Sequence, residues 1–404
     1  MTDRYKEEII DPGDRASQLA KDICFQSHNN CKAVRVIPHQ PRNFRGPVGF
    51  LWQPHILEMM KLAGNKKDWV MAEEVENDGA GGKPQFFTLV GTPEVFRGLG
   101  WEIICMTADD FARSGRLPCI IDNEINAKRI TKENFHLFQA MMEGYGQALR
   151  QSDLCNITGE VAIMKHSITA FCDTGSDEQL ILTWGASCIG LACKQLLLDG
   201  SKIKPGMPVV GFAERGYRCN GGTFFTNLLL TKFGPEIPRI MANKEAVEFV
   251  KRLTAPSISY AKTICRLLGW KRNGGVRPEP LAKILGIAHI TGGGMAKFAE
   301  ILPEGVGAYL NTMPRPPRVL LQAQDLSWDT DLHLTDLQAH TTLHGGCGMV
   351  LVCADEQSAQ KIIKEAARDF IKAQIIGRTV DAQEYKGKLV ILSRFREGKP
   401  VIIN

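Results

Sequence analysis

The sequence predicts a fold of mixed helices and strands, of the α/β or α+β class, arranged in two domains. The chain of 404 residues is long enough to bury a sizeable core in each of two domains. Its 44% hydrophobic and 23% charged residues are ordinary for a globular protein. Short apolar runs typical of strands alternate with helical patterns in both halves, and this alternation predicts the fold class.

The first half contains one clear helix and several strand-like runs. Residues 131–149 are predicted to be helical because Phe135, Phe138 and Met142 fall on one face, with Thr131 as the helix cap. A shorter helix is expected at 16–24, and the prolines from Pro38 to Pro47 indicate an irregular segment. Strands are expected at 69–74, 100–108, 117–121 and 157–165.

The second half continues the alternation after an expected boundary between 164 and 172, which gives domains of residues 1–166 and 167–404. Asp355 is predicted to cap a helix that runs to Phe370. Further helices are expected at 224–230, 259–268 and 295–301. Strands are expected at 180–184, 187–192, 209–213, 349–353, 374–378 and 389–394.

Charge and composition argue against nucleic acid and membranes as partners. The net charge of +5 is mild, and no run of Lys and Arg is interleaved with aromatic residues. No apolar run is long enough to cross a bilayer, and the charged segment 1–14 lacks the apolar core of a signal peptide. The twelve cysteines include no Cys-x-x-Cys pair and often lie in apolar runs, which predicts buried free thiols and a reducing, cytoplasmic compartment.

Two glycine-rich loops suit an anionic ligand. Gly292, Gly293 and Gly294 end an apolar run just before an expected helix, so their N–H groups can approach a phosphate, although a tight turn is the simpler interpretation. The loop 78–83, Asp-Gly-Ala-Gly-Gly-Lys, combines a carboxylate for Mg²⁺ with amides and an ammonium for phosphate oxygens. A hairpin turn explains this second loop equally well.

Acidic residues form a second group of candidates. Asp109 and Asp110 follow the apolar run 103–108, and adjacent carboxylates repel each other unless a cation lies between them or one faces solvent. Metal binding and a helix cap at Asp110 are both open interpretations. Glu160, after Thr158-Gly159, is either a ligand or an ordinary turn residue.

The loop 216–223 connects an expected strand to an expected helix, a geometry able to hold an anion. Arg218 adds a permanent cation whose planar fork suits phosphate or carboxylate. The alternative is an ordinary connection capped by Asn220 or Thr223. His289 lies beside the glycine loop 292–294 and could act as acid, base or hydrogen-bond donor, although a structural role is commoner for a lone histidine.

In their order along the chain, eight segments resemble the aminoimidazole ribonucleotide synthetase superfamily, which has a PurM-like fold. Residues 78–83 resemble the family's Asp-Gly-Val-Gly-Thr-Lys, and residues 158–162 resemble its Gly-Gly-Glu-Thr-Ala. Residues 288–294 closely resemble Thr-His-Ile-Thr-Gly-Gly-Gly. The other similar segments are 10–14, 106–118, 216–221, 255–262 and 342–350.

The resemblance implies an N-terminal domain that forms a β-barrel-like interface with its twin in a homodimer, followed by a C-terminal α/β domain. It implies ATP and Mg²⁺ near the domain and subunit interfaces. The implied metal ligands are Asp78, Asp110 and Glu160. The implied catalytic residues are Asp110, His289 and Arg218. The implied nucleotide and substrate contacts are Asp78, Gly79, Gly81, Lys83, Asp109, Glu160, Asn220, Gly292, Gly293 and Gly294.

The activity implied by the resemblance is that of an ATP-dependent cyclo-ligase of purine biosynthesis, which phosphorylates an amide oxygen that an internal nitrogen then displaces. Mg²⁺ and cations stabilise the phosphoryl charge in such a reaction, and no side-chain nucleophile is needed. The family's Asn is Asp109 in this sequence, and its His-Ser pair is Arg218-Cys219. ATP-dependent phosphorylation or ligation of a different small substrate therefore stays an alternative, as does a nucleotide-binding partner protein without its own turnover.

Overall fold

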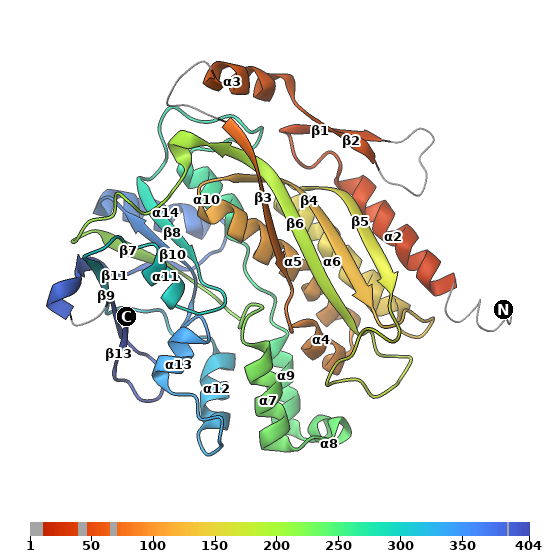
Figure 1. Cartoon of the computed structure of the whole chain (residues 1–404). Coiled ribbons are helices and arrows are strands. Elements are labelled where there is room, and N and C mark those ends of the chain that lie inside the picture. The colour runs from red at the N-terminus through yellow and green to blue at the C-terminus, as the bar shows by residue number, and fades with distance from the viewer. Residues whose placement is uncertain (1–10, 39–46, 65–70, 386–387) are drawn as a thin grey trace.

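Two β-sheets and the helices around them make up the described part of the chain (Figure 1). The computed structural model describes residues 11–38, 47–64, 71–385 and 388–404. Most of the proline-rich segment, and residues Trp69 and Val70 of an expected strand, lie outside the described residues.

The first sheet has four strands in the order β3-β6-β4-β5, and only β4 and β5 run parallel. Its strands are β3 (Met71–Gly79), β4 (Leu117–Ala127), β5 (Cys155–Ile163) and β6 (Leu182–Cys193). Helices α5 (Pro93–Arg113) and α6 (Phe135–Gln151) pack together on one face, behind the sheet in Figure 1. Helix α2 (Asp11–Ser27) packs against β5 and α6.

The opposite face of this sheet carries exposed side chains. Val75 on β3 is 64% exposed. Glu124 on β4 and Glu160 on β5 are paired neighbours and are both exposed. The sheet is therefore packed on its helix-bearing face and accessible on the other.

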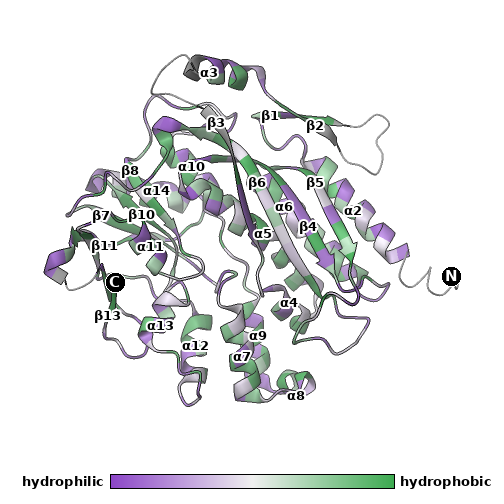
Figure 2. Ribbon diagram, viewed as in Figure 1, coloured by the Kyte–Doolittle hydropathy of each residue, from purple (hydrophilic) through white to green (hydrophobic). Residues whose placement is uncertain are grey.

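The second sheet has seven strands in the order β13-β12-β9-β11-β7-β10-β8, with a single parallel pair, β9 and β12. Its strands are β7 (Pro208–Ala213), β8 (Ile284–His289), β9 (Val306–Leu310), β10 (Cys347–Cys353), β11 (Ala373–Asp381), β12 (Leu389–Leu392) and β13 (Pro400–Ile403). Every residue of β10, which lies between β7 and β8, is buried, and Figure 2 shows this strand as predominantly hydrophobic. Such a strand is covered on both faces.

The remaining elements connect and cover the sheets. Helix α14 (Glu356–Arg368) packs on β7, β10 and β11, and α10 (Ala261–Leu268) contacts both α5 and α14. The short elements are β1 (Val34–Pro38), β2 (Pro47–Trp52), α3 (Pro54–Gly64), α4 (Pro84–Val90), η2 (Lys194–Leu196) and η3 (Ala382–Tyr385). The helices below the sheets in Figure 1 are α7 (Gly222–Phe233), α8 (Ile237–Ala242), α9 (Lys244–Leu253), α12 (Arg318–Ser327) and α13 (Asp336–Thr341), and α11 (Ala296–Glu300) follows β8.

The strand predicted at 100–108 is wrong, because these residues lie within helix α5. The helix is buried on nearly all sides, so its apolar run has the composition of a buried strand. Gly100 allows α6 to approach closely, since a Cβ at that position would lie 2.3 Å from the backbone nitrogen of Tyr145. Asp109 and Asp110 therefore lie near the end of a helix instead of following a strand.

The strand predictions near the expected domain boundary also need adjustment. The runs 180–184 and 187–192 belong to one strand, β6, and this strand pairs with both β3 and β4. The four-stranded sheet thus contains residues from both sides of the boundary expected after residue 166. The boundary itself stays a prediction.

All twelve cysteines are buried and none forms a disulfide, as the sequence predicted. Burial raises the pKa of Cys24 and of Cys347 to about 12. Burial also raises the pKa of Cys219 well above the usual thiol value. These thiols are protonated at neutral pH and are poor nucleophiles. Within the described residues, no helix has the length and apolar character that crossing a bilayer would require.

Helix α14 ends in a conformation that normally requires glycine. Phe370 has a φ of +59°, and the N–H of Ile371 donates to the carbonyl of Ala366 at 3.0 Å. These features define a Schellman motif with Phe370 at the left-handed position. The Phe370 ring is 95% exposed, so packing within the chain does not offset the strain.

Replacing Phe370 with glycine is expected to raise the free energy of unfolding by about 0.5–1 kcal/mol. The substitution removes a left-handed strain of about 1–2 kcal/mol but adds the backbone entropy of glycine, about 0.5–1 kcal/mol. Urea denaturation followed by circular dichroism measures the difference. Phe370→Ala is the control, since it removes the ring but keeps the strain, and an equal gain in both variants would contradict this explanation.

Candidate functional site

A buried arginine connects helix α5 to the seven-stranded sheet at the candidate site. Arg218 lies in the loop between β7 and α7, and its guanidinium donates to Asp109 of α5 at 3.1 Å and to Glu214 at 2.7 Å. It also donates to the carbonyl oxygens of Cys105 and Ile258. All three charged side chains are at most 1% exposed. The fork of an arginine suits this role because it can pair with two carboxylates at once.

The pKa values of the two carboxylates shift in opposite directions. Burial raises the pKa of Asp109 to about 7, although the charge of Arg218 and the backbone N–H groups of Tyr260 and Ala261 oppose the rise. Burial also raises the pKa of Glu214, but Arg218 and His344 outweigh it and leave that pKa below its usual value. The cluster is thus held together by charge-assisted hydrogen bonds in a region without solvent.

A second buried ion pair lies beside the first. Lys83 donates to Glu102 of α5 at 2.8 Å and to the carbonyl oxygen of Ala255 at 2.9 Å, and it is fully buried. Glu102 also accepts from the backbone and hydroxyl groups of Ser257. The structure therefore places the Lys83 ammonium among groups of the protein itself, where it joins the 78–83 loop to α5 and to the segment after α9.

His289 at the end of β8 lies between an acid and the buried arginine. Its Nδ1 is 2.8 Å from Asp110, and its Nε2 is 2.7 Å from the guanidinium of Arg218. Because an arginine can only donate, Nε2 must accept, and Nδ1 then carries the proton that is donated to Asp110. Burial and the charge of Arg218 lower the pKa of His289 to about 4. The imidazole is therefore neutral at physiological pH.

Asp78 and Asp110 share an electrostatic environment. Burial raises the pKa of Asp78 to about 6, and the charge of Asp110 contributes to the rise. Burial acts in the same direction on Asp110, but its hydrogen bond with His289 and the charge of Arg113 outweigh burial, so the pKa of Asp110 lies below its usual value. A carboxylate of this kind can hold a cation that also relieves its repulsion with a neighbour.

Two glycine loops that are far apart in the sequence meet here. Gly81 has a φ of +55°, and a Cβ on it would lie 2.7 Å from the carbonyl oxygen of Cys219. A Cβ on Gly82 would lie 3.7 Å from the Cα of Gly222. The absence of side chains thus lets the loop after β3 contact the loop before α7 directly. Gly79, the last residue of β3, lies instead beside Trp184 of β6.

The third glycine loop completes the same region. A Cβ on Gly292 would lie 3.4 Å from the side-chain oxygen of Asn220. The amide nitrogen of Asn220 and Nε of Arg218 are buried and have no hydrogen-bond partner among the described residues. Gly293 and Gly294 have positive φ, but Gly294 packs tightly against the carbonyl oxygens of His340 and Leu343. The unpartnered groups are donors that a ligand could satisfy.

Glu160 is separated from the other predicted ligands. The register aligns Asp78 with Ala186, Asn123 and Gly159 across the four strands, while Glu160 aligns with Glu124. Since neighbouring positions along a strand point to opposite faces, Glu160 and Asp78 lie on opposite faces and at opposite edges of the sheet. Three strand spacings correspond to about 14 Å. One chain cannot bring these two carboxylates to the same ion.

The residues present fit a phosphate-bound Mg²⁺ better than a protein-only metal site. Among the described residues, no three side chains of His, Cys, Asp or Glu are grouped as a set of metal ligands. Mg²⁺ commonly uses only one or two carboxylates together with phosphate and water oxygens. Asp78 and Asp110 can supply those carboxylates, and the unpartnered Asn220 can supply a donor to a ligand.

Two apparent departures from the family pattern form a single interaction. Asp109, where the family has Asn, pairs with Arg218, where the family has His. The sequence analysis missed Glu102, Glu214 and Ser257, which complete the buried networks. Glu102 offered a signal, because a carboxylate within an apolar run must find a partner when the run is buried.

His340, at the end of α13 beside this region, predicts a pH dependence of stability. Both ring nitrogens are buried and without a partner among the described residues, and burial lowers the pKa of His340 to about 4. The unfolded chain, with a histidine pKa of about 6.5, takes up the proton first. The free energy of unfolding therefore has its full contribution from neutral His340 above about pH 6.5, and this contribution falls as the pH drops toward about 4.

Replacing His340 with leucine is expected to reduce the loss of stability between pH 7 and pH 4 by up to about 2–3 kcal/mol. Urea denaturation at several pH values measures this loss. Leucine in place of the exposed His136 controls for the removal of an imidazole. An unchanged pH dependence in the His340 variant would contradict the assignment.

Comparison with known proteins supports the resemblance to the aminoimidazole ribonucleotide synthetase superfamily. A family model for the C-terminal domain of AIR synthase related proteins matches residues 266–390. The phosphoribosylformylglycinamidine cyclo-ligase of Methanocaldococcus jannaschii is 23% identical over 317 residues, covering 78% of this chain and 81% of the relative. That of Bacillus mycoides is 26% identical over 286 residues, covering 70% and 73%.

Solved structures show the likeness of fold. The hydrogenase maturation protein HypE has a TM-score of 0.50 at 11% identity, covering 87% of this chain and 96% of that one. A structure of HypE in complex with ATP also has a TM-score of 0.50 at 11% identity, covering 86% and 91%. At this identity the likeness concerns the fold alone.

The fold and the family match define the class: a PurM-like protein of mixed α and β structure. Within this class, residues 266–390 match the C-terminal domain of AIR synthase related proteins, and the chain is distantly similar to phosphoribosylformylglycinamidine cyclo-ligases. The resemblance drawn from the sequence is confirmed at this level.

Proposed function

We propose that the chain is an ATP- and Mg²⁺-dependent enzyme that phosphorylates an oxygen of a small substrate, with cyclisation of formylglycinamidine ribonucleotide as its reaction. The observation that carries the proposal is the meeting of three glycine loops with Asp78, Asp110 and the unpartnered Asn220. The similarity to cyclo-ligases supports the choice of reaction. Bound ATP in HypE, which has the same fold, supports the choice of nucleotide.

In this proposal, the chain's own residues provide binding and electrostatic stabilisation. Asp78 and Asp110 would hold Mg²⁺, and the backbone N–H groups of Gly81 and Gly292 would face the phosphates, while the N–H of Gly79 donates to Oδ1 of Asp78. Mg²⁺ supplies charge for the transferred phosphoryl group. His289 donates its Nδ1 proton to Asp110 and so orients that carboxylate, while its neutral state at pH 7 excludes a role as an imidazolium acid.

The proposed activity is tested by measuring phosphate release from ATP with formylglycinamidine ribonucleotide and Mg²⁺. Turnover that depends on this substrate supports the cyclo-ligase. ATP turnover only with another amide or carboxylate metabolite would favour the second candidate, a ligase or kinase for a different substrate. That candidate draws on Arg218 and Cys219, which differ from the family's His-Ser pair. Tight ATP binding without turnover on any substrate would indicate a nucleotide-binding partner protein.

We further propose a homodimer in a reducing, cytoplasmic compartment, formed through the exposed face of the four-stranded sheet. Val75, Glu124 and Glu160 lie on strands of this sheet and are exposed in the single chain. The buried, reduced cysteines are typical of a reducing compartment. Because Glu160 lies far from Asp78 within one chain, it can contribute to a metal site only across such an interface.

Mixing Asp110→Asn chains with Glu160→Gln chains is expected to restore activity that neither variant has alone. Random exchange makes about half of the dimers mixed, and each mixed dimer has one site with both wild-type residues, so about a quarter of wild-type activity returns. Unfolding and refolding the mixture permits the exchange, and substrate-dependent phosphate release measures it. Two inactive variants that stay inactive after mixing would exclude Glu160 from the partner's site.

A further inference from the structure

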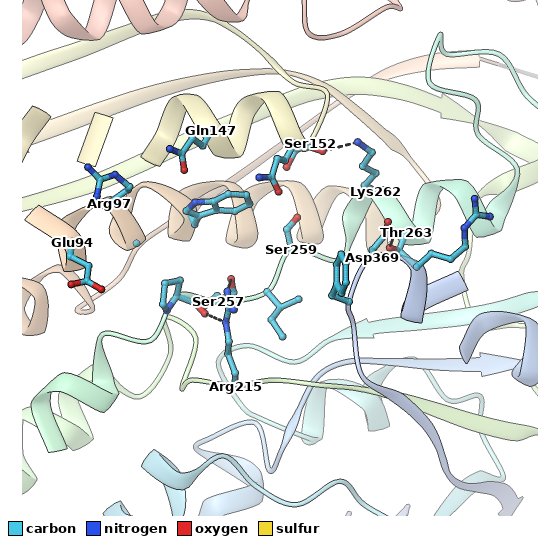
Figure 3. A pocket seen from close by; sticks show the side chains of 17 residues that line it. Glu94, Arg97, Gln147, Ser152, Arg215, Ser257, Ser259, Lys262, Thr263 and Asp369 are labelled. Atoms are coloured by element: carbon cyan, nitrogen blue, oxygen red, sulfur yellow. Dashed lines mark hydrogen bonds between the residues drawn. The ribbon is translucent and has the colours of Figure 1, made fainter. Parts of the chain in front are cut away.

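A cavity of about 720 Å³ lies outside the candidate site and has no role in the proposed reaction. Figure 3 shows its lining, which comes from α5, α6, the loop after β7, the segment between α9 and α10, the start of α10 and the end of α14. This volume is within the range of small-molecule binding sites, about 300–1,000 Å³. The proposed catalytic residues Asp110, Arg218 and His289 do not line it.

The charge of the cavity favours an anion. Four cations line it, Arg97, Arg215, Lys262 and Arg368, against the two carboxylates of Glu94 and Asp369. Asp369 is paired with Arg266. Three of the cations are also paired, Arg97 with Glu143, Lys262 with Asp153 and Arg368 with Glu365. Arg215 is the lining cation that has no carboxylate partner among the described residues, and its positive charge in a concave site attracts anionic ligands.

Two of these cations are held in place by the backbone. Nε of Arg215 donates to the carbonyl oxygen of Pro256 at 2.6 Å, and among the described residues no carboxylate pairs with Arg215. Lys262 donates to the carbonyl oxygen of Gln151 at 2.8 Å, a bond drawn beside Ser152 in Figure 3, and it pairs with Asp153 at 3.0 Å while remaining 47% exposed. Their charged ends are therefore positioned before any ligand arrives.

Two aromatic side chains line the same cavity. Trp101 projects from α5 into the wall, and Phe370 lines the side formed by the end of α14. Phe370 is nearly fully exposed and occupies a left-handed position where glycine is usual. A strained residue that presents an apolar ring to solvent gains nothing within the chain, and such strain is typical of functional positions.

We propose that this cavity is a second ligand site, for a small anion that carries a flat ring. The ring packs against Phe370 and Trp101, and the anionic group lies against Arg215 and Lys262. Planar rings stack on aromatic side chains, and a guanidinium suits a phosphate or carboxylate group. The site is separate from the proposed ATP site and does not depend on the proposed reaction.

The cavity and the candidate site share one segment of backbone. Residues 256–259 line the cavity, while the carbonyl oxygen of Ile258 accepts from Arg218 and Ser257 bonds Glu102 on the other side. A ligand in the cavity therefore contacts the segment that positions the buried arginine. Binding there is expected to change the environment of Arg218 without occupying its site.

The test uses the full chain, without Mg²⁺ and with EDTA, and titrates three probes: adenosine 5′-monophosphate, adenosine and inorganic phosphate. The monophosphate combines a ring with an anion, and the other two probes each supply one half. Calorimetry is expected to show saturable binding of the monophosphate, at least about tenfold tighter than either half. Phe370→Gly and Arg215→Gln are each expected to weaken it by about fivefold or more.

Control variants locate the binding. Lys251→Gln removes an exposed cation elsewhere, and Asp110→Asn alters the proposed ATP site, so both are expected to bind the monophosphate as the wild type does. Trp101→Phe is expected to keep binding in calorimetry but to lose the change in tryptophan fluorescence. The proposal is overturned if no probe binds saturably. It is also overturned if Phe370→Gly and Arg215→Gln both bind the monophosphate within about twofold of the wild type.

Discussion

Replacing Arg218 with methionine is expected to lower the free energy of unfolding by about 3–5 kcal/mol. The substitution keeps a long side chain but leaves Asp109 and Glu214 buried together without their cation. It also leaves the carbonyl oxygen of Ile258 without its donor. Urea denaturation at pH 7.5 measures the loss.

A triple variant separates lost charge from lost packing. Arg218→Met combined with Asp109→Asn and Glu214→Gln removes the uncompensated charges and is expected to recover part of the stability. Arg378→Met breaks an exposed pair with Glu356 and is expected to cost less than about 1 kcal/mol. If Arg218→Met costs no more than Arg378→Met, the buried cluster is not a source of stability.

Replacing Asp110 with asparagine is expected to weaken Mg²⁺-dependent ATP binding by about 100-fold or more and to abolish turnover. Asparagine keeps an oxygen that can accept from Nδ1 of His289, but it removes the charge proposed to hold the cation. Calorimetry with ATP and Mg²⁺ measures the affinity. Light scattering checks that the proposed dimer persists.

Asp325→Asn serves as the matched control, because it makes the same chemical change at an exposed carboxylate on α12. It is expected to leave affinity and turnover unchanged. An Asp110→Asn protein that binds ATP and Mg²⁺ within about threefold of the wild type would show that this carboxylate does not hold the cation.

Much of the fold could be predicted because local signals were strong. Asp355 caps α14 by accepting from the N–H of Ser358, as its position before the helix indicated. The strands β7, β10 and β11 match runs of apolar residues near the predicted bounds. Helix α5 was misassigned because burial on nearly all sides removes the polar face by which an amphipathic helix is recognised.

The candidate site was predicted in outline but not in its connections. The glycine loops could be identified as loops able to approach a ligand, and the structure brings residues 81–82 and 219–222 together. The sequence could not indicate that Lys83 pairs with Glu102, because this contact depends on how α5 packs. The separation of Glu160 from Asp78 likewise depends on strand order and register, which one sequence does not specify.

The buried thiols allow local unfolding of the protein to be measured by chemical labelling. Cysteines lie in both sheets, at Cys188 and Cys193 of β6 and at Cys347 and Cys353 of β10, all shielded from solvent. An alkylating reagent can reach each of them only when the surrounding strands separate, so labelling rates record local unfolding. Mass spectrometry of the labelled peptides would then give separate opening free energies for the two sheets, and would show whether they unfold as one cooperative unit.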